Sequence, residues 1–134
     1  MNWARIAMAV AAAGVAASFT DWLFMGVLFH GKYLETPEMW RRPQGGQGET
    51  QAIVLTSLVS TISCAVIIYL CERMHMHTYS QSLKLAVAMW VAALPILATF
   101  SLWTKYHPTL AFAHSLGWLA RFVLSAVAAT LLMH

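Results

Sequence analysis

The chain has 134 residues, of which 60% are hydrophobic and only 10% are charged, and its formal net charge is +3. Soluble domains carry about 45–50% apolar and about 25% charged residues, so this composition excludes an ordinary soluble protein. The eight Lys and Arg residues are spread thinly along the chain. This spacing argues against a nucleic-acid-binding protein and favours a lipid bilayer as the partner.

Four apolar segments follow one another, at about residues 3–29, 51–71, 83–103 and 109–133. A bilayer core about 30 Å thick is crossed by roughly 20 apolar residues in a helix. Because backbone groups in lipid must be satisfied within the protein, spans of this length are expected to be helices. We therefore predict an all-α fold, an integral membrane four-helix bundle. Residues 1–134 form a single domain in this prediction, with both termini on one side of the membrane.

The connection between the first two spans is the longest and the most charged. Within it, Thr36-Pro37 has the pattern of a helix cap followed by the first helical position, and "EMWRR" comes directly after. This pattern predicts one or two interfacial helical turns between helices 1 and 2, with Trp40 at the depth of the lipid headgroups. A plain solvated loop fits the length of the segment equally well.

One carboxylate, that of Asp21, lies inside the first span. It belongs to a face of small and polar residues spaced three or four apart: Gly14, Ser18, Asp21 and Met25. The fourth span carries a similar stripe, made of His114, Gly117, Arg121, Ser125 and Ala128. A polar stripe within a span normally faces the interior of a helix bundle. The two faces are therefore expected to meet.

Depth and side-chain direction predict that Asp21 pairs with Arg121. Asp21 lies about 7 Å beyond the midpoint of its span, and Arg121 lies near the midpoint of a span that runs the other way. Helical side chains lean toward their own N-terminus, so these two lean toward each other. The pair either locks the first and fourth spans together or belongs to a substrate or proton pathway, and the sequence leaves both interpretations open.

Residues around the charge pair indicate a ligand pocket formed by Trp22, Met25, His114 and Trp118. Its ligand would be a small apolar or cationic molecule, with Asp21 as the counter-charge. His114 and Met25 match in depth, so a haem with His and Met axial ligands is an alternative interpretation. A lone embedded histidine more often makes a hydrogen bond within the bundle.

The stretch "MHMH", residues 74–77, offers sulfur and imidazole groups that suit copper. His75 and His77 are the candidate metal ligands, but two histidines do not complete a site, and a polar interfacial loop is the simpler interpretation. No Ser-His-Asp set, nucleotide-binding loop or zinc motif is present in the sequence. We expect no cofactor and no enzyme activity, with haem or copper as the alternatives.

Three functions fit this pattern. The first is a small multi-pass scaffold or accessory subunit that packs its small-residue faces against other membrane proteins or a second copy of itself. The second is a transporter or binding protein for a small ligand at the site of Asp21, Arg121 and His114. The third is a haem- or metal-binding redox membrane protein.

Several motifs resemble those of a bacterial family of small four-span membrane proteins, domain of unknown function 1761. The segment "DWLFMGVLFHGKYLETPEMW" is similar to the family pattern at the end of the first span, through Trp22, Phe29, Gly31, Lys32 and Trp40. In the third span, "MWVAALP" resembles the family's tryptophan and proline, at Trp90 and Pro95. Leu23 stands where the family has a tyrosine, and His30 separates the phenylalanine from the glycine. The resemblance implies a four-helix fold in a bacterial inner (plasma) membrane, and it implies no activity.

Overall fold

The computed structural model describes residues 2–35, 37–39, 48–105 and 107–133. In these ranges the chain forms helices and no strand: α1 (Trp3–Asp21), η1 (Trp22–Leu28), α2 (His30–Leu34), η2 (Pro37–Met39), α3 (Glu49–Arg73), α4 (Tyr79–Trp103) and α5 (Pro108–Met133). Four helical segments are long and apolar enough to cross a membrane, namely α1 with η1, α3, α4 and α5. The prediction of an all-α bundle of membrane-spanning helices is confirmed.

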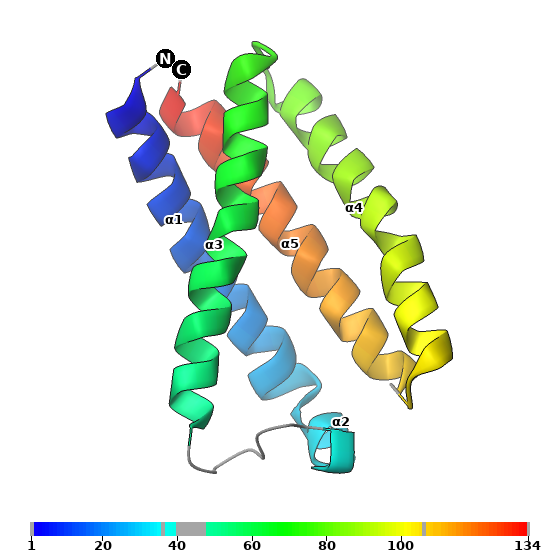
Figure 1. Ribbon diagram of the computed structural model, residues 1–134. Coiled ribbons are helices and arrows are strands. Elements are labelled where there is room, and N and C mark those ends of the chain that lie inside the picture. Colours follow the sequence, from blue (N-terminus) through cyan, green and yellow to red (C-terminus); the bar gives the residue numbers. More distant parts are fainter. Residues whose placement is uncertain (1, 36, 40–47, 106, 134) are drawn as a thin grey trace.

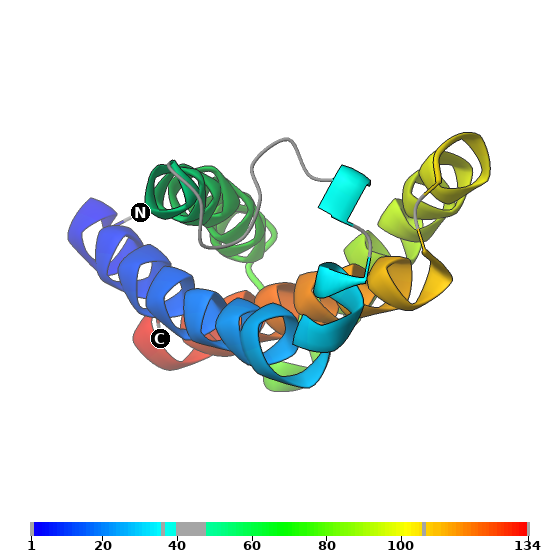
Figure 2. The same cartoon turned by 90° about the horizontal axis from the view of Figure 1, so that it is seen from below.

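Helix α5 lies in the middle of the molecule, between α1 and α4, and α3 packs against both α1 and α5 (Figures 1 and 2). Helix α5 contacts each of the other three long helices. In contrast, α3 and α4 diverge from the turn that joins them (Figure 1). Both termini lie at the end where this turn is, which we call the terminal end, and α2 lies at the opposite end, which we call the α2 end.

Two polar contacts fix α4 against α5. The indole nitrogen of Trp90 donates hydrogen bonds to the backbone oxygen and the hydroxyl of Ser115, at 2.9 and 3.1 Å. Nearer the terminal end, the hydroxyl of Thr130 donates to that of Ser82 at 3.0 Å. Such interhelical hydrogen bonds stabilise membrane bundles, in which the hydrophobic effect between helices is weak. Trp90, one of the residues shared with the family pattern, therefore has a packing role.

The connection after the first span contains the short helices α2 and η2 in its described part. The predicted helical turn is present at Pro37–Met39, whereas Thr36 and Trp40 lie outside the described residues. On the exposed surface of this connection, Lys32 forms an ion pair with Glu35 at 2.7 Å. Residues 30–34 are helical as well, so the ordered helix continues beyond the predicted end of the first span.

The half of the bundle near the terminal end is closely packed around small residues. Ala9, Ala13 and Ala17 of α1 are buried against α3 and α5. A Cβ atom added at Gly14 would lie only 3.0 Å from the hydroxyl oxygen of Thr61 on α3. The small-residue face of the first span is therefore used inside the chain, where it lets α1 and α3 approach closely.

The first span changes from an α-helix to a π-helix directly after Asp21. In η1 the backbone bonds run from residue i to i+5, as in the 2.8 Å bond from the Phe29 nitrogen to the Phe24 oxygen. Each such turn encloses one more residue than an α-helical turn, and π-helical turns are frequent at functional sites. The uniform α-helical spacing assumed from the sequence therefore fails beyond Asp21, and this shift brings His30 onto the same side as Met25 and Gly26.

Candidate functional site

The structure brings Asp21 and Arg121 together. Asp21 is the last residue of α1, and the Nη2 atom of Arg121, on α5, donates a hydrogen bond to its Oδ2 atom. The side chain of Arg121 is 5% exposed and that of Asp21 is 21% exposed. The Nε atom of Arg121 is also buried and has no hydrogen-bond partner among the described residues. Arg121 therefore depends on Asp21 for compensation of its buried charge.

The neighbours of the pair on α5 explain how the carboxylate can approach this helix. A Cβ atom added at Gly117 would lie 3.1 Å from Oδ1 of Asp21, so the missing side chain leaves room for the carboxylate. The guanidinium carbon of Arg121 lies 5.2 Å from the centre of the Trp118 ring, within the range of a cation–π contact. Gly117 and Trp118 thus hold the two charged groups in a defined place.

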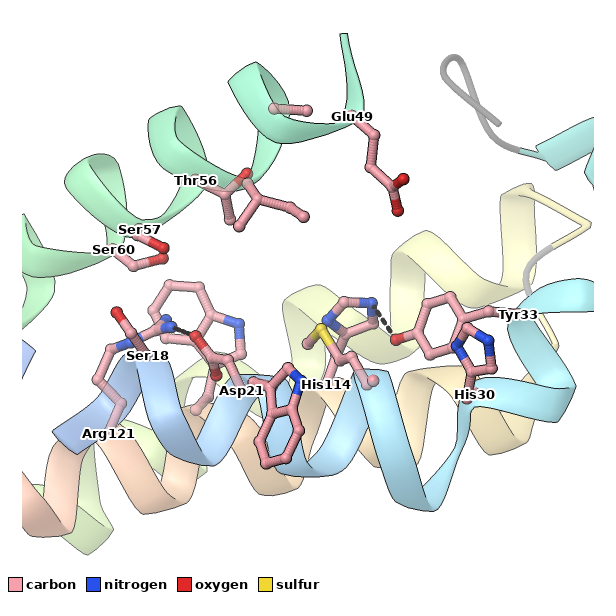
Figure 3. Close-up of a pocket in the computed structure, with 16 residues that line it drawn as sticks. Ser18, Asp21, His30, Tyr33, Glu49, Thr56, Ser57, Ser60, His114 and Arg121 are labelled. Carbon is pink, nitrogen blue, oxygen red and sulfur yellow. Dashed lines mark hydrogen bonds and ion pairs between the residues drawn. The ribbon is translucent and has the colours of Figure 1, made fainter. Parts of the chain in front are cut away.

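The charge pair forms part of the wall of a cavity of about 750 Å³. This volume lies within the range of about 300–1,000 Å³ that is usual for small-molecule sites. Figure 3 shows the cavity between α3 on one side and α1, η1, α2 and α5 on the other. The four residues predicted as a ligand pocket all line it: Trp22, Met25, His114 and Trp118.

His114 makes a contact that was not predicted from the sequence. Its Nε2 atom lies 3.0 Å from the hydroxyl oxygen of Tyr33, a buried residue of α2 (Figure 3). The rings of Tyr33 and His114 also meet edge to face, with their centroids 6.0 Å apart. This contact ties α2 to α5 in the wall of the cavity. The only sequence signal was that Tyr33 follows His30 at the three-residue spacing of a helical face.

Replacing Tyr33 by phenylalanine removes only the hydroxyl that contacts His114. A neutral hydrogen bond contributes about 0.5–1.5 kcal/mol, so we expect Tyr33→Phe to lower the free energy of unfolding in detergent by about that amount. Tyr69→Phe is the matched control, because Tyr69 is 42% exposed on α3. Equal stability of the two variants and the wild type, measured by thermal unfolding, would show that the Tyr33–His114 bond contributes nothing.

The wall of the cavity on α3 is rich in hydroxyl groups. Thr56, Ser57 and Ser60 lie along one face of this helix, with Glu49 at its start, and all four line the cavity (Figure 3). They were not among the predicted site residues, because nothing in the apolar second span indicated which face would be next to Asp21. The cavity thus has polar groups on two opposing walls.

The candidate metal ligands lie elsewhere. His75 and His77 are in the turn between α3 and α4, at the terminal end, with ring centroids 6.0 Å apart. Among the described residues no three His, Cys, Asp or Glu side chains are grouped so that they would hold a metal ion. His114 and Met25 both line the cavity, but Nε2 of His114 faces Tyr33. Haem or copper binding stays a prediction, which the absorption spectrum and metal content of the purified protein would test.

Comparisons with known proteins agree with the motifs. No curated protein and no solved structure matches the chain. The model of one family, described as protein of unknown function (DUF1761), matches residues 8–130. The matched range includes Asp21, Arg121 and the whole lining of the cavity. The chain therefore belongs to this family of proteins of unknown function, as its tryptophan, glycine and proline motifs indicated.

Proposed function

We propose that this membrane protein binds a small organic cation with an apolar body in the cavity beside Asp21. The observation that carries the proposal is the cavity itself, a space of about 750 Å³ whose described lining includes the carboxylates of Asp21 and Glu49. Carboxylate oxygens beside a cavity favour a positively charged ligand. The surrounding apolar side chains favour a ligand that is otherwise hydrophobic.

The groups around Asp21 support a cation in particular. Oδ2 of Asp21 accepts the hydrogen bond from Arg121, whereas Oδ1 accepts none from the described residues. Trp22 lines the cavity and is 58% exposed, so its ring is accessible to a ligand. A cation over an indole ring gains about 0.5–2 kcal/mol, depending on how far it is desolvated. A ligand between Trp22 and Asp21 would use both contacts.

Binding of tetraphenylphosphonium, a cation with a large apolar surface, tests the proposal. We expect saturable binding to the purified protein in equilibrium dialysis, weakened about two- to thirtyfold by Trp22→Ala, as the loss of one cation–π contact implies. Trp103→Ala is the matched control, since Trp103 is 87% exposed at the end of α4 and does not line the cavity. Absence of saturable binding to the wild type, or equal weakening by both variants, would contradict the proposal.

A role as a scaffold or accessory subunit stays a prediction. Its motives were the absence of a catalytic set, the small mass outside the membrane and the small-residue faces. Of these faces, that of the first span is used within the chain, where Gly14 packs against Thr61. The geometry therefore gives more support to ligand binding than to scaffolding. Native mass spectrometry of protein extracted from its own membrane tests the scaffold, which requires stable complexes with other subunits or with a second copy.

A further inference from the structure

We infer that the cavity is a one-sided aqueous channel, which leads from the α2 end of the bundle to the ion pair of Asp21 and Arg121 near the middle of the membrane and is closed toward the terminal end. The inference extends the proposed function and rests on it for the identity of the ligand, a small cation. It adds the route of entry and the side of the membrane from which the cation comes. Both follow from the order of polar and apolar groups along the helices.

The hydroxyl face of α3 gives the channel its depth. Glu49 begins the helix, and Thr56, Ser57 and Ser60 follow on the side that lines the cavity. The twelve residues from Glu49 to Ser60 span about 16 Å along the helix axis, at 1.5 Å per residue. This is about half of a hydrocarbon core of roughly 30 Å. Polar groups on one face of α3 therefore reach from the membrane surface to its middle.

The opposite wall carries polar groups over a similar depth. His30 and Tyr33 lie at the α2 end, His114 lies deeper, and Asp21 with Ser18 lies deepest (Figure 3). Figure 3 shows these side chains facing Glu49, Thr56, Ser57 and Ser60 across the cavity. Polar side chains in a span normally face the bundle interior or a water-filled space. Two polar walls on either side of a cavity of this size fit a space that holds water.

One helical turn deeper, the same faces are closed. On α3, Cys64 follows Ser60 by four residues and is completely buried. On α1, Gly14 precedes Ser18 by four residues and is buried. On α5, Ser125 follows Arg121 by four residues and is completely buried. From there to the terminal end the bundle is filled by a packed core that includes Ile67 and Ile68. The ion pair of Asp21 and Arg121 is therefore the floor of the channel.

The proposal predicts which positions on α3 react with a charged reagent that does not cross membranes. Single-cysteine replacements in proteoliposomes would be treated with the cationic thiol reagent trimethylammonioethyl methanethiosulfonate. We expect Thr56→Cys and Ser60→Cys to react. Leu55→Cys and Val59→Cys are matched controls of equal depth, because Leu55 and Val59 are exposed on the apolar surface of the same helix and do not line the cavity. They are expected not to react.

The native cysteines lie beyond the floor, with Cys64 one helical turn past Ser60 and Cys71 near the terminal end, and they need no replacement. Cys64 and Cys71 are free and buried, so the wild type should not react. Two surface positions report orientation, with Glu35→Cys marking the α2 end and His75→Cys the terminal end. Reaction of Ser60→Cys should occur in the same fraction of molecules as that of Glu35→Cys. Each variant would first be shown to keep the helix content and elution volume of the wild type.

Several results would overturn the channel. A folded Ser60→Cys variant that does not react would contradict it, and so would a wild type that reacts at Cys64. Reaction of Ser60→Cys in the same fraction of molecules as that of His75→Cys would place the opening at the terminal end. Equal reaction of Val59→Cys and Ser60→Cys would show that the reagent does not distinguish the cavity from the lipid-facing surface. Reaction of Ser60→Cys with the uncharged, membrane-permeant N-ethylmaleimide alone would show entry from the bilayer instead. Failure of the proposed function can be distinguished from failure of the channel. Tetraphenylphosphonium binding without reaction at Ser60→Cys contradicts only the channel, and reaction without binding contradicts only the ligand.

Discussion

Neutralising either member of the Asp21–Arg121 pair is expected to destabilise the protein strongly, by about 3–5 kcal/mol for each single replacement. Asp21→Asn leaves a guanidinium buried with only a neutral amide beside it, and Arg121→Met leaves a carboxylate without its cation in an apolar bundle. Replacing both groups removes both uncompensated charges, so the double variant should recover much of the loss. Thermal unfolding of all four proteins in one detergent gives the coupling energy of the pair.

The exposed pair of Lys32 and Glu35 is the control for this cycle. Its side chains are 44% and 58% exposed, and exposed ion pairs contribute about 0–1 kcal/mol. Lys32→Met and Glu35→Gln should therefore change the unfolding temperature little, alone or together. If the effects of Asp21→Asn and Arg121→Met were simply additive, the pair would not stabilise the fold as argued.

Inserting one alanine after Val27 is expected to turn α2 away from the cavity. The π-helix η1 already holds one residue more in each turn than an α-helix, and Val27 is 49% exposed within it. Removing a residue would let η1 become an α-helix with α2 still facing the same way, whereas an added residue turns all that follows by about 100° about the axis. His30 and Tyr33 then leave the cavity, and the contact of Tyr33 with His114 is lost.

The expected result of this insertion is a bundle that still folds but binds tetraphenylphosphonium more than tenfold more weakly, a loss of at least about 1.4 kcal/mol. Helix α2 changes its direction, whereas α3, α4 and α5 keep their packing. The substitution Val27→Ala is the control, because it shortens the side chain and keeps the backbone register. If the insertion variant kept the wild-type dissociation constant, the orientation of α2 would have no part in forming the site.

The position of the charge pair could be predicted because it depends on rules that act along a helix. Rise per residue sets depth, and the lean of side chains toward the N-terminus sets reach. These rules were sufficient for Asp21 and Arg121, which lie in or next to regular α-helix. The helix bounds follow the same logic, since the second span was expected at residues 51–71 and the helix is Glu49–Arg73.

The remainder of the site could not be predicted, for two physical reasons. A π-helix breaks the regular spacing from which faces are deduced, so nothing placed His30 and Tyr33 beside the cavity. The hydroxyl groups of the second span lie on one side of the helix and suit hydrogen bonds to any neighbouring helix, so the sequence does not tell that this side meets Asp21. That choice depends on how α3 packs against α1 and α5, including the close contact of Gly14 with Thr61.

Binding of tetraphenylphosphonium to the double variant Asp21→Asn/Arg121→Met tests the central claim most directly. This protein is expected to be close to the wild type in stability, and it lacks the carboxylate that we propose as the counter-charge of the ligand. Equilibrium dialysis of both proteins in the same detergent separates loss of binding from loss of folding. The account predicts a folded double variant whose dissociation constant for the cation is at least about tenfold higher than that of the wild type. A folded double variant that binds the cation as tightly as the wild type would contradict it.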